Sequence, residues 1–328
     1  MTLSSSKNLK EKLQGIIPVQ LIPFTSDDEI DQEGLAENTQ YLVDFAENGN
    51  KDVVILTNGS TSEFYSMSTE EQKTVIKTVV DNSGDVPVIA GTGRPGTKET
   101  IKMTQIAKDL GSDGSMVVLP YYHQATKQGM YQHYEMVAEN VDIDIMIYNN
   151  PFVSGSWIDA DLMKKLSKIE NIIAVKENTS SGPQWHDLAS KVEQENMNLI
   201  CGLGEKMYPL TVNIGAKGLV STIANFAPDI SYQMYEAGRD KDIEKVEDIC
   251  ERLNPYFEVM NKLIANRKDT SILPDTRRGN PVYQAMGKFA LDFVGLTGGS
   301  VRSPMIGLTD DEKSMLEEAL EEMEVKKV

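Results

Sequence analysis

The sequence predicts an α/β protein that folds as a closed (β/α)8 barrel, the TIM-barrel architecture, with an appended C-terminal helical region. Three observations lead to this prediction. Eight short apolar runs follow one another along the chain, segments of helical length separate them, and after about residue 240 helical segments continue without strands. Alternating strands and helices predict a parallel sheet with crossover helices. Eight such units favour a closed barrel over an open sheet.

The expected strands are apolar runs bounded by polar or turn-forming residues. They cover Ile16–Phe24, Asp52–Thr57, Pro87–Gly91, Ser115–Pro120, Ile143–Asn149, Ile172–Glu177, Asn198–Gly202 and Gly218–Ser221. Short runs that are apolar throughout are typical of strands buried on both faces, as in parallel sheets. An open sheet that binds a dinucleotide would need a Gly-x-Gly-x-x-Gly turn after an early strand, and the sequence has none.

Amphipathic segments of helical length lie between these runs. The clearest are Gln32–Glu47, Thr69–Asn82, Lys98–Leu110, Gln128–Glu139 and Ala160–Lys168. Ser68 precedes one of them and offers a capping hydroxyl, with Glu70 and Glu71 in the first turn. A capping hydroxyl followed by acids is typical of a helix start.

The pattern changes after the eighth unit. Asp242–Asn266, Pro281–Val294 and Thr309–Glu324 read as helices, joined by the polar stretch Arg267–Asn280 and the Gly-rich Gly295–Ser300. We therefore predict a catalytic barrel over residues 1–240 and a helical region packed on it over residues 241–328. The last helix carries many acids, which predicts a solvated face.

Composition narrows the class of function. The chain has 32 Lys and Arg against 50 Asp and Glu, a net charge of -18, which argues against nucleic acid or an anionic membrane as partner. Cys201 and Cys250 are the only cysteines, so no disulfide framework is expected and a reducing compartment is favoured. Neither an apolar secretory signal nor a run long enough to span a membrane is present. We expect a cytoplasmic protein.

Lys176 is the most informative residue. It follows the apolar run Ile172–Val175, at the end of an expected buried strand. In a barrel, reactive groups gather at the C-terminal ends of strands. Burial lowers the pKa of a lysine, and the neutral amine attacks ketones, so the position suggests imine (Schiff-base) chemistry. Alternatively, the side chain extends its charge to the surface from a strand end.

Other strand ends carry polar groups. The turn Gly59–Thr61 offers two hydroxyls and successive backbone N–H groups that can hold a carboxylate, or it is an ordinary turn that caps a helix. Ser60 and Glu63 have the spacing of a capping box, so Glu63 either caps a helix or has a catalytic role. Tyr148 can relay protons, or it is a core tyrosine with a satisfied hydroxyl. Tyr121 and Tyr122 have the same ambiguity, and the pair could equally pack at an interface.

No metal site is predicted. His123, His133 and His186 stand far apart and show no metal-ligand spacing, and surface positions are expected for His133 and His186. Cys201 and Cys250 have no CxxC partner, so we assign both to packing.

Short motifs follow one another along the chain in a set order. They are Ile22-Pro23-Phe24, Gly59-Ser60-Thr61-Ser62-Glu63-Phe64, Ala90-Gly91-Thr92-Gly93, Pro120-Tyr121-Tyr122, Tyr148-Asn149-Asn150-Pro151, Val175-Lys176-Glu177, Gly218-Leu219-Val220-Ser221 and Arg302-Ser303-Pro304. This ordered set resembles the dihydrodipicolinate synthase / N-acetylneuraminate lyase family of class I aldolases, from about Gly15 to Pro304. One such motif would be weak, but the ordered set is specific.

The resemblance implies roles for individual residues. Lys176 would form an imine with pyruvate or a pyruvate-yielding 2-oxo acid, and Tyr148 would shuttle protons. Ser60 or Thr61 would hold the substrate carboxylate, with Ser60 continuing the proton relay. Tyr122 would reach into a neighbouring subunit's site, which implies a homo-oligomer, a dimer or tetramer. Substrate contacts would also come from Asn150 and Val220, with no cofactor besides the lysine imine.

Departures from the family pattern bear on the substrate. Members that condense pyruvate with aspartate semialdehyde carry an arginine where Val153 stands here, and a valine cannot donate to a carboxylate. The Gly-Ser-Thr turn and Ser154–Gly155 lean toward members that handle sugar acids, while Pro120–Tyr122 looks more like the synthase and 2-keto-3-deoxy acid groups. Ser62 replaces the family's usual glycine, which would alter the turn if that position requires a positive φ.

We therefore predict a Schiff-base lyase or aldolase that acts on pyruvate or a sugar-acid-like 2-keto-3-deoxy acid. The alternatives are dihydrodipicolinate synthase itself, or a dehydratase or deaminase that uses the same imine. A polar pocket around Asn149, Asn150 and Ser154 would favour a polyol-bearing substrate. Rivals from other classes are a binding protein that has lost turnover and a metal-dependent aldolase, which would need clustered His and acid ligands.

Overall fold

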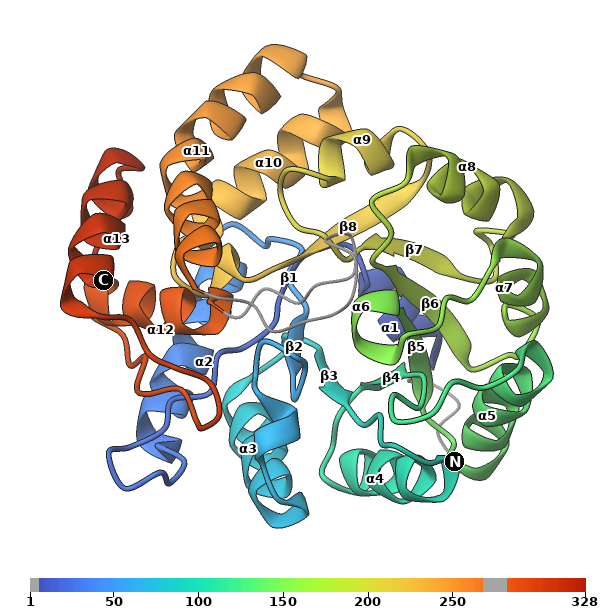
Figure 1. Cartoon of the computed structure of the whole chain (residues 1–328). Coiled ribbons are helices and arrows are strands. Elements are labelled where there is room, and N and C mark those ends of the chain that lie inside the picture. The colour runs from blue at the N-terminus through green and yellow to red at the C-terminus, as the bar shows by residue number, and fades with distance from the viewer. Residues whose placement is uncertain (1–5, 268–281) are drawn as a thin grey trace.

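Eight parallel strands form the centre of the molecule. A computed structural model describes residues 6–267 and 282–328. The strands are β1 (Gly15–Pro18), β2 (Ile55–Thr57), β3 (Val88–Gly91), β4 (Gly114–Val118), β5 (Asp144–Asn149), β6 (Ile172–Glu177), β7 (Asn198–Cys201) and β8 (Ala216–Ser221). Each pairs in parallel with its sequence neighbour from β2 to β8, and β8 pairs with β1. Figure 1 shows the strands as a ring with helices outside it.

Isolated bridges between β1 and β2 close the ring. Ile16 bridges to Val53 and Val19 bridges to Leu56, both in parallel. Gln20 N donates to Leu56 O at 2.8 Å just beyond β1. The predicted (β/α)8 TIM barrel is therefore confirmed.

The outer ring consists of crossover helices. These are α2 (Gln32–Glu47), α3 (Thr69–Asn82), α4 (Thr97–Asp109), α5 (Lys127–Asn140), α7 (Ala160–Leu166), α8 (Gly182–Lys191), α9 (Tyr208–Val212) and α10 (Pro228–Asp240), with the short α6 (Pro151–Ser154), η1 (Phe64–Ser66) and η2 (Ile223–Asn225) in the loops. The bounds of α2 and α3 match the prediction. Ser68 caps α3 in a complete capping box with Glu71, as the sequence indicates.

One helix was not expected. α1 (Ser6–Lys12) precedes β1, and Figure 1 shows it behind the ring of strands. Leu9 and Leu13 pack in the same cluster as the interior residues Ile17, Ile89 and Ile173. α1 therefore closes the N-terminal end of the barrel with apolar side chains.

The first predicted strand is too long. β1 ends at Pro18, although the apolar run continues to Phe24. Contacts with neighbouring strands continue only to Gln20, because Leu21 N donates to the Asn225 side chain instead of a strand, at 3.3 Å. Leu21 then joins the core of the C-terminal helices.

Three helices follow the barrel in the part of the chain that the structure describes. They are α11 (Ile243–Asn266), α12 (Tyr283–Val294) and α13 (Asp310–Glu322). The expected start of the second at Pro281 and the joining stretch lie outside the described residues, except for Arg267. These helices share a core with α10 that includes Met234, Leu253, Met286 and Leu316. The division into residues 1–240 and 241–328 stays a prediction.

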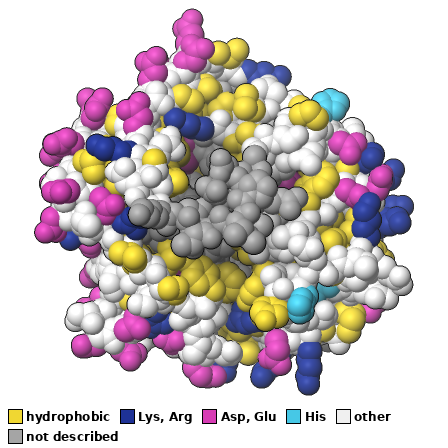
Figure 2. All heavy atoms as spheres, in the orientation of Figure 1, with side chains coloured by type: hydrophobic (Ala, Val, Ile, Leu, Met, Phe, Trp, Pro, Cys, Tyr) yellow, Lys and Arg dark blue, Asp and Glu magenta, His cyan; other side chains and the backbone are white. Residues whose placement is uncertain are grey.

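Acidic side chains lie on the outside. On α13, Asp310, Asp311, Glu317, Glu318, Glu321 and Glu322 are all exposed, so the solvated face predicted for this helix is confirmed. Figure 2 shows Asp and Glu side chains gathered along the rim of this face of the molecule, beyond the barrel. Among the described helices, none is long and apolar enough to cross a membrane.

Candidate active site

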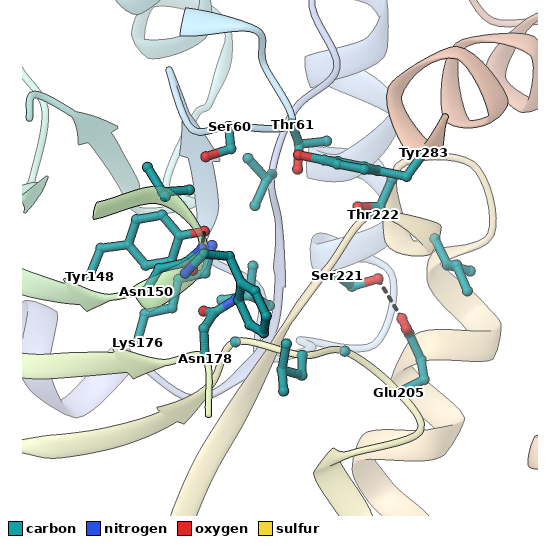
Figure 3. Close-up of a pocket in the computed structure, with 18 of the residues that line it drawn as sticks. Ser60, Thr61, Tyr148, Asn150, Lys176, Asn178, Glu205, Ser221, Thr222 and Tyr283 are labelled. Carbon is teal, nitrogen blue, oxygen red and sulfur yellow. Dashed lines mark hydrogen bonds between the residues drawn. The ribbon is translucent and has the colours of Figure 1, made fainter. Parts of the chain in front are cut away.

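A cavity of about 370 Å³ opens at the C-terminal ends of the strands. Lys176 reaches it from β6, Tyr148 from β5 and Val220 from β8, while Ser60 and Thr61 come from the turn after β2. Figure 3 shows the lysine and the tyrosine side by side, with the two hydroxyl-bearing residues across the cavity. The barrel topology thus brings together residues that lie far apart in sequence.

Lys176 is buried beside Tyr148. The two are register partners on neighbouring strands, and only 5% of the lysine surface is exposed. Lys176 Nζ lies 4.2 Å from the centroid of the Tyr148 ring. Burial lowers the pKa of Lys176, and this effect outweighs Tyr148, which raises it. The amine of Lys176 is therefore neutral, and so nucleophilic, in a larger fraction of molecules than the amine of a solvated lysine.

Tyr148 is oriented by Asn150. Asn150 Nδ2 donates to Tyr148 Oη at 2.6 Å, and Asn150 Oδ1 accepts from Phe152 N at 2.9 Å at the start of α6. Because the amide occupies an acceptor position of the phenol, the phenol keeps its own proton for a further partner, and it is also hydrogen-bonded to Lys176. The residue predicted as a substrate contact thus also positions Tyr148.

The turn that carries Ser60 and Thr61 is tightly bonded. Ser62 N donates to Gly59 O and Glu63 N donates to Ser60 O, both at 3.1 Å. Ser62 Oγ donates to Gln20 O at 2.6 Å and accepts from Gly59 N at 3.2 Å. The positive φ falls on Glu63, at 55°, and not on Ser62. A serine is therefore accommodated where the family usually has glycine.

Glu63 lies behind the turn, away from the cavity. Its carboxylate is 2.6 Å from Lys288 Nζ on α12, with both side chains almost fully buried, and it accepts from Arg302 N at 3.0 Å. It caps no helix with its side chain. The capping-box hypothesis for Ser60–Glu63 is wrong, because the buried lysine binds the carboxylate.

Six of the seven predicted site residues border the one cavity: Lys176, Tyr148, Ser60, Thr61, Asn150 and Val220. Tyr122 does not. It is 80% exposed, and its ring contacts His123 with a centroid distance of 4.9 Å. Within this chain Tyr122 does not border the cavity that the others share.

The polar pocket expected around Asn149, Asn150 and Ser154 is only partly correct. Asn150 borders the cavity, but Asn149 and Ser154 do not. Asn149 Nδ2 donates to the Glu177 carboxylate at 2.6 Å, and Ser154 Oγ donates to Asn150 O at 2.9 Å. Both side chains hold the loop after β5 in place instead of facing a substrate.

A second polar wall of the cavity was missed at the level of sequence. Glu205, after β7, is buried and accepts from Ser221 Oγ and, at 2.6 Å, from Ser231 Oγ. Burial raises the pKa of Glu205 despite these donors. Tyr256 of α11 borders the same wall, and its hydroxyl has no hydrogen-bond partner among the described residues. Figure 3 shows the Glu205 and Ser221 side chains joined, away from Lys176.

Potential metal ligands do not cluster. Within residues 6–267 and 282–328, no group of three His, Cys, Asp or Glu side chains is placed to hold a metal ion. His186 is exposed as expected, but His133 is buried on α5, where burial lowers its pKa to about 4. The surface position expected for His133 is wrong, because its ring packs against Tyr134.

Comparisons with known proteins agree on one family. The model of the Dihydrodipicolinate synthetase family matches residues 12–323. A 4-hydroxy-tetrahydrodipicolinate synthase of Methanothrix thermoacetophila is 31% identical over 310 residues, which cover 94% of this chain and 97% of that protein. The enzyme of the same name from Archaeoglobus fulgidus is 31% identical over 95% of this chain and 99% of its own length.

Solved structures give the same result. A dihydrodipicolinate synthase from Aquifex aeolicus is 30% identical and superposes with a TM-score of 0.81, covering 95% of this chain and 99% of that one. YagE, a prophage protein of Escherichia coli K12 from the dihydrodipicolinic acid synthase family, solved in complex with pyruvate, is 27% identical with a TM-score of 0.82 and the same coverage.

Proposed function

Because the chain belongs to the dihydrodipicolinate synthetase family, whose members are lyases of the class I aldolase type, we propose that Lys176 forms an imine with a 2-oxo acid. The observation that carries this proposal is the buried amine of Lys176, with a lowered pKa, directly beside the Tyr148 phenol in a cavity at the barrel mouth. The substrate is pyruvate or a 2-oxo acid that releases pyruvate.

The residues around Lys176 fit the steps of such a reaction. The neutral amine adds to the C2 carbonyl, and loss of water from the adduct gives the imine. Tyr148 moves protons to and from the departing oxygen. The C4 hydroxyl then gives its proton to Tyr148 and C4 leaves as an aldehyde, while the protonated imine accepts the electron pair of the C3–C4 bond and becomes an enamine in place of a free carbanion. Ser60 and Thr61 hold the carboxylate through hydroxyl and backbone N–H groups.

The far wall of the cavity favours a hydroxylated substrate tail. Glu205, Tyr256 and Ser221 place a carboxyl and two hydroxyls there, and Val153 rather than a cation borders the cavity after β5. A buried polar atom without a partner costs about 1–3 kcal/mol, so a ligand hydroxyl beside Tyr256 Oη would recover free energy. We therefore propose a 2-keto-3-deoxy acid of the sugar-acid type as the substrate.

Condensation of pyruvate with aspartate semialdehyde is the second candidate. The names of the archaeal relatives at 31% identity favour it, and they support it at least as well as the family supports sugar-acid cleavage. A dehydratase or deaminase would share the imine and differ only in the bond broken next. Val153 separates the candidates, because the aspartate semialdehyde carboxylate would need a donor that valine lacks.

Reductive trapping tests the imine. Borohydride added with pyruvate is expected to inactivate the enzyme and to add the mass of a reduced pyruvyl group to the peptide that holds Lys176. The Lys176→Arg variant, which keeps a cation but offers no comparable nucleophile, serves as the control and should remain unlabelled. An unmodified peptide in active protein would exclude imine chemistry.

A substrate panel tests the tail. Release of pyruvate from 2-keto-3-deoxy acids, compared with condensation of aspartate semialdehyde, separates the two candidates directly. Tyr256→Phe should lower kcat/KM for a hydroxylated acid by about 2- to 12-fold, the effect of one neutral hydrogen bond. Borohydride trapping of Tyr256→Phe with pyruvate, which has no hydroxylated tail, should differ less from trapping of the wild type. If the enzyme acted on aspartate semialdehyde and on none of the 2-keto-3-deoxy acids, the proposal of a hydroxylated substrate tail would be wrong.

Tyr122 is proposed to act on a neighbouring copy. An aromatic side chain that is 80% exposed is available for a subunit contact, and Tyr122 lies in the loop between β4 and α5. We propose a cytoplasmic homo-oligomer, dimer or tetramer, in which this ring enters the partner's site. Sedimentation of the wild type and of Tyr122→Ala would test the assembly, since loss of the contact should shift the protein toward smaller species.

A further inference from the structure

Tyr283 is a second phenol in the cavity and comes from outside the barrel. It is the first residue of α12 and borders the same cavity as Lys176. Figure 3 shows its ring extended across the cavity from the C-terminal helices, with the hydroxyl at Thr61. Its hydroxyl is hydrogen-bonded to the Thr61 side chain and lies near Tyr148. The two phenols therefore approach the reacting centre from opposite sides.

α12 is fixed to the turn that carries Ser60 and Thr61. Gln284 Nε2 donates to Ser60 O at 3.4 Å, and Lys288 Nζ pairs with Glu63 at 2.6 Å. One helix thus contacts the turn at both ends and places the phenol beside it. A donor held in position before the substrate arrives loses little entropy when it binds, which strengthens its contact.

The chemistry of the hydroxyl suits an anion. Burial raises the pKa of Tyr283 far above its ordinary value, so the phenol stays protonated and can donate. A carboxylate accepts up to about four hydrogen bonds, more than the Ser60 and Thr61 hydroxyls alone can supply. The nearest substrate group to Thr61 is, under the proposed function, the carboxylate next to the imine carbon.

We propose that Tyr283, whose oxygen accepts from the Thr61 hydroxyl, donates its own proton to the carboxylate of the imine-bound 2-oxo acid, together with Ser60 and the backbone N–H of Thr61. This inference rests on the proposed function. It makes the C-terminal helical region part of the substrate site, so the barrel residues alone do not complete it. Tyr283 contacts the substrate, whereas Gln284 and Lys288 only position it.

The test compares two carbonyl compounds that differ in the carboxylate. Borohydride trapping is measured for Tyr283→Phe against increasing pyruvate and against increasing hydroxyacetone, which has a ketone but no carboxylate. A hydrogen bond to a charged group contributes about 1.5–3 kcal/mol. Half-saturation by pyruvate should therefore rise about 10- to 150-fold, while half-saturation by hydroxyacetone should change less than about 3-fold.

Tyr134→Phe is the matched control, since it also removes one buried phenol oxygen, which donates to Val117 O at 3.1 Å outside the cavity. It should leave both saturation curves unchanged. If half-saturation rose equally for both compounds in Tyr283→Phe, or did not rise for pyruvate, the proposed contact with the carboxylate would be wrong. The proposed function would still stand. If the wild type itself gave no pyruvyl adduct, the proposed function would fail and this inference with it.

Discussion

Tyr148→Phe is expected to lower kcat by about 10²- to 10⁴-fold, the usual contribution of a positioned acid–base group. The variant keeps the ring against which Lys176 Nζ lies at 4.2 Å and loses only the hydroxyl, including its hydrogen bond to that lysine. It removes the hydroxyl that Asn150 orients at 2.6 Å. Proton transfer should therefore suffer far more than pyruvate binding. Single-turnover trapping and steady-state kinetics measure the two effects separately.

Tyr208→Phe provides the comparison for this variant. Tyr208 is a buried tyrosine of α9 that does not border the cavity, so its loss should change kcat little. Equal losses of pyruvate binding and turnover in Tyr148→Phe would mean that the phenol mainly shapes the cavity. In that case the proton relay would have to be assigned to another group, and Ser60 and Tyr283 would be examined next.

The second large effect is expected from the ion pair between α12 and the turn. Lys288→Met should lower the free energy of unfolding by about 3–5 kcal/mol, because it leaves the Glu63 carboxylate buried without its partner. Both side chains are at most 2% exposed, so solvent cannot replace the lysine. Urea unfolding measures the change. Pyruvate binding should weaken as well, since Glu63 follows Ser60 and Thr61 directly in the same turn.

A double variant separates the cost of the lone charge from the value of the pair. Burial lowers the pKa of Lys288 to about 8 even beside Glu63, so removal of the lysine from water outweighs the attraction between the two groups. Glu63→Gln combined with Lys288→Met should therefore recover most of the stability lost in Lys288→Met. A double variant as unstable as the single one would show that the charge pair itself stabilises the fold.

The alternation of the chain was enough to predict the barrel. The run Ile172–Glu177 coincides with β6, and α2 and α3 have the predicted bounds. The spacing of apolar residues, and the turn-forming residues between the runs, predict these elements well. The reason is that crossover helices have one apolar face and parallel strands have two. These patterns fail at β1, where Leu21 leaves the sheet for a side-chain acceptor on a residue 204 positions away. No local pattern encodes that contact.

The site was predictable as far as it sits on strand ends. Lys176, Tyr148 and the Ser60–Thr61 turn each follow an apolar run, and the topology brings their C-terminal ends to one edge. Tyr256 and Tyr283 were missed, because both lie on helices where an aromatic residue usually indicates packing. Which helix faces the barrel mouth depends on how the C-terminal helices dock. That docking is set by contacts between distant residues rather than by the period of either helix.

The apolar seal at the base of the barrel has a consequence for the order of events. Leu9 of α1 and Leu13, which follows the helix, are buried in one cluster with Ile17, Ile89 and Ile173, so apolar side chains fill the described part of the barrel at the end opposite Lys176. Under the proposed cleavage, the substrate, the departing aldehyde and the water that hydrolyses the imine would all use the entrance at the Lys176 end. In that reaction the aldehyde would leave before pyruvate, which stays bound to Lys176 until hydrolysis, and added pyruvate should inhibit cleavage by occupying the lysine.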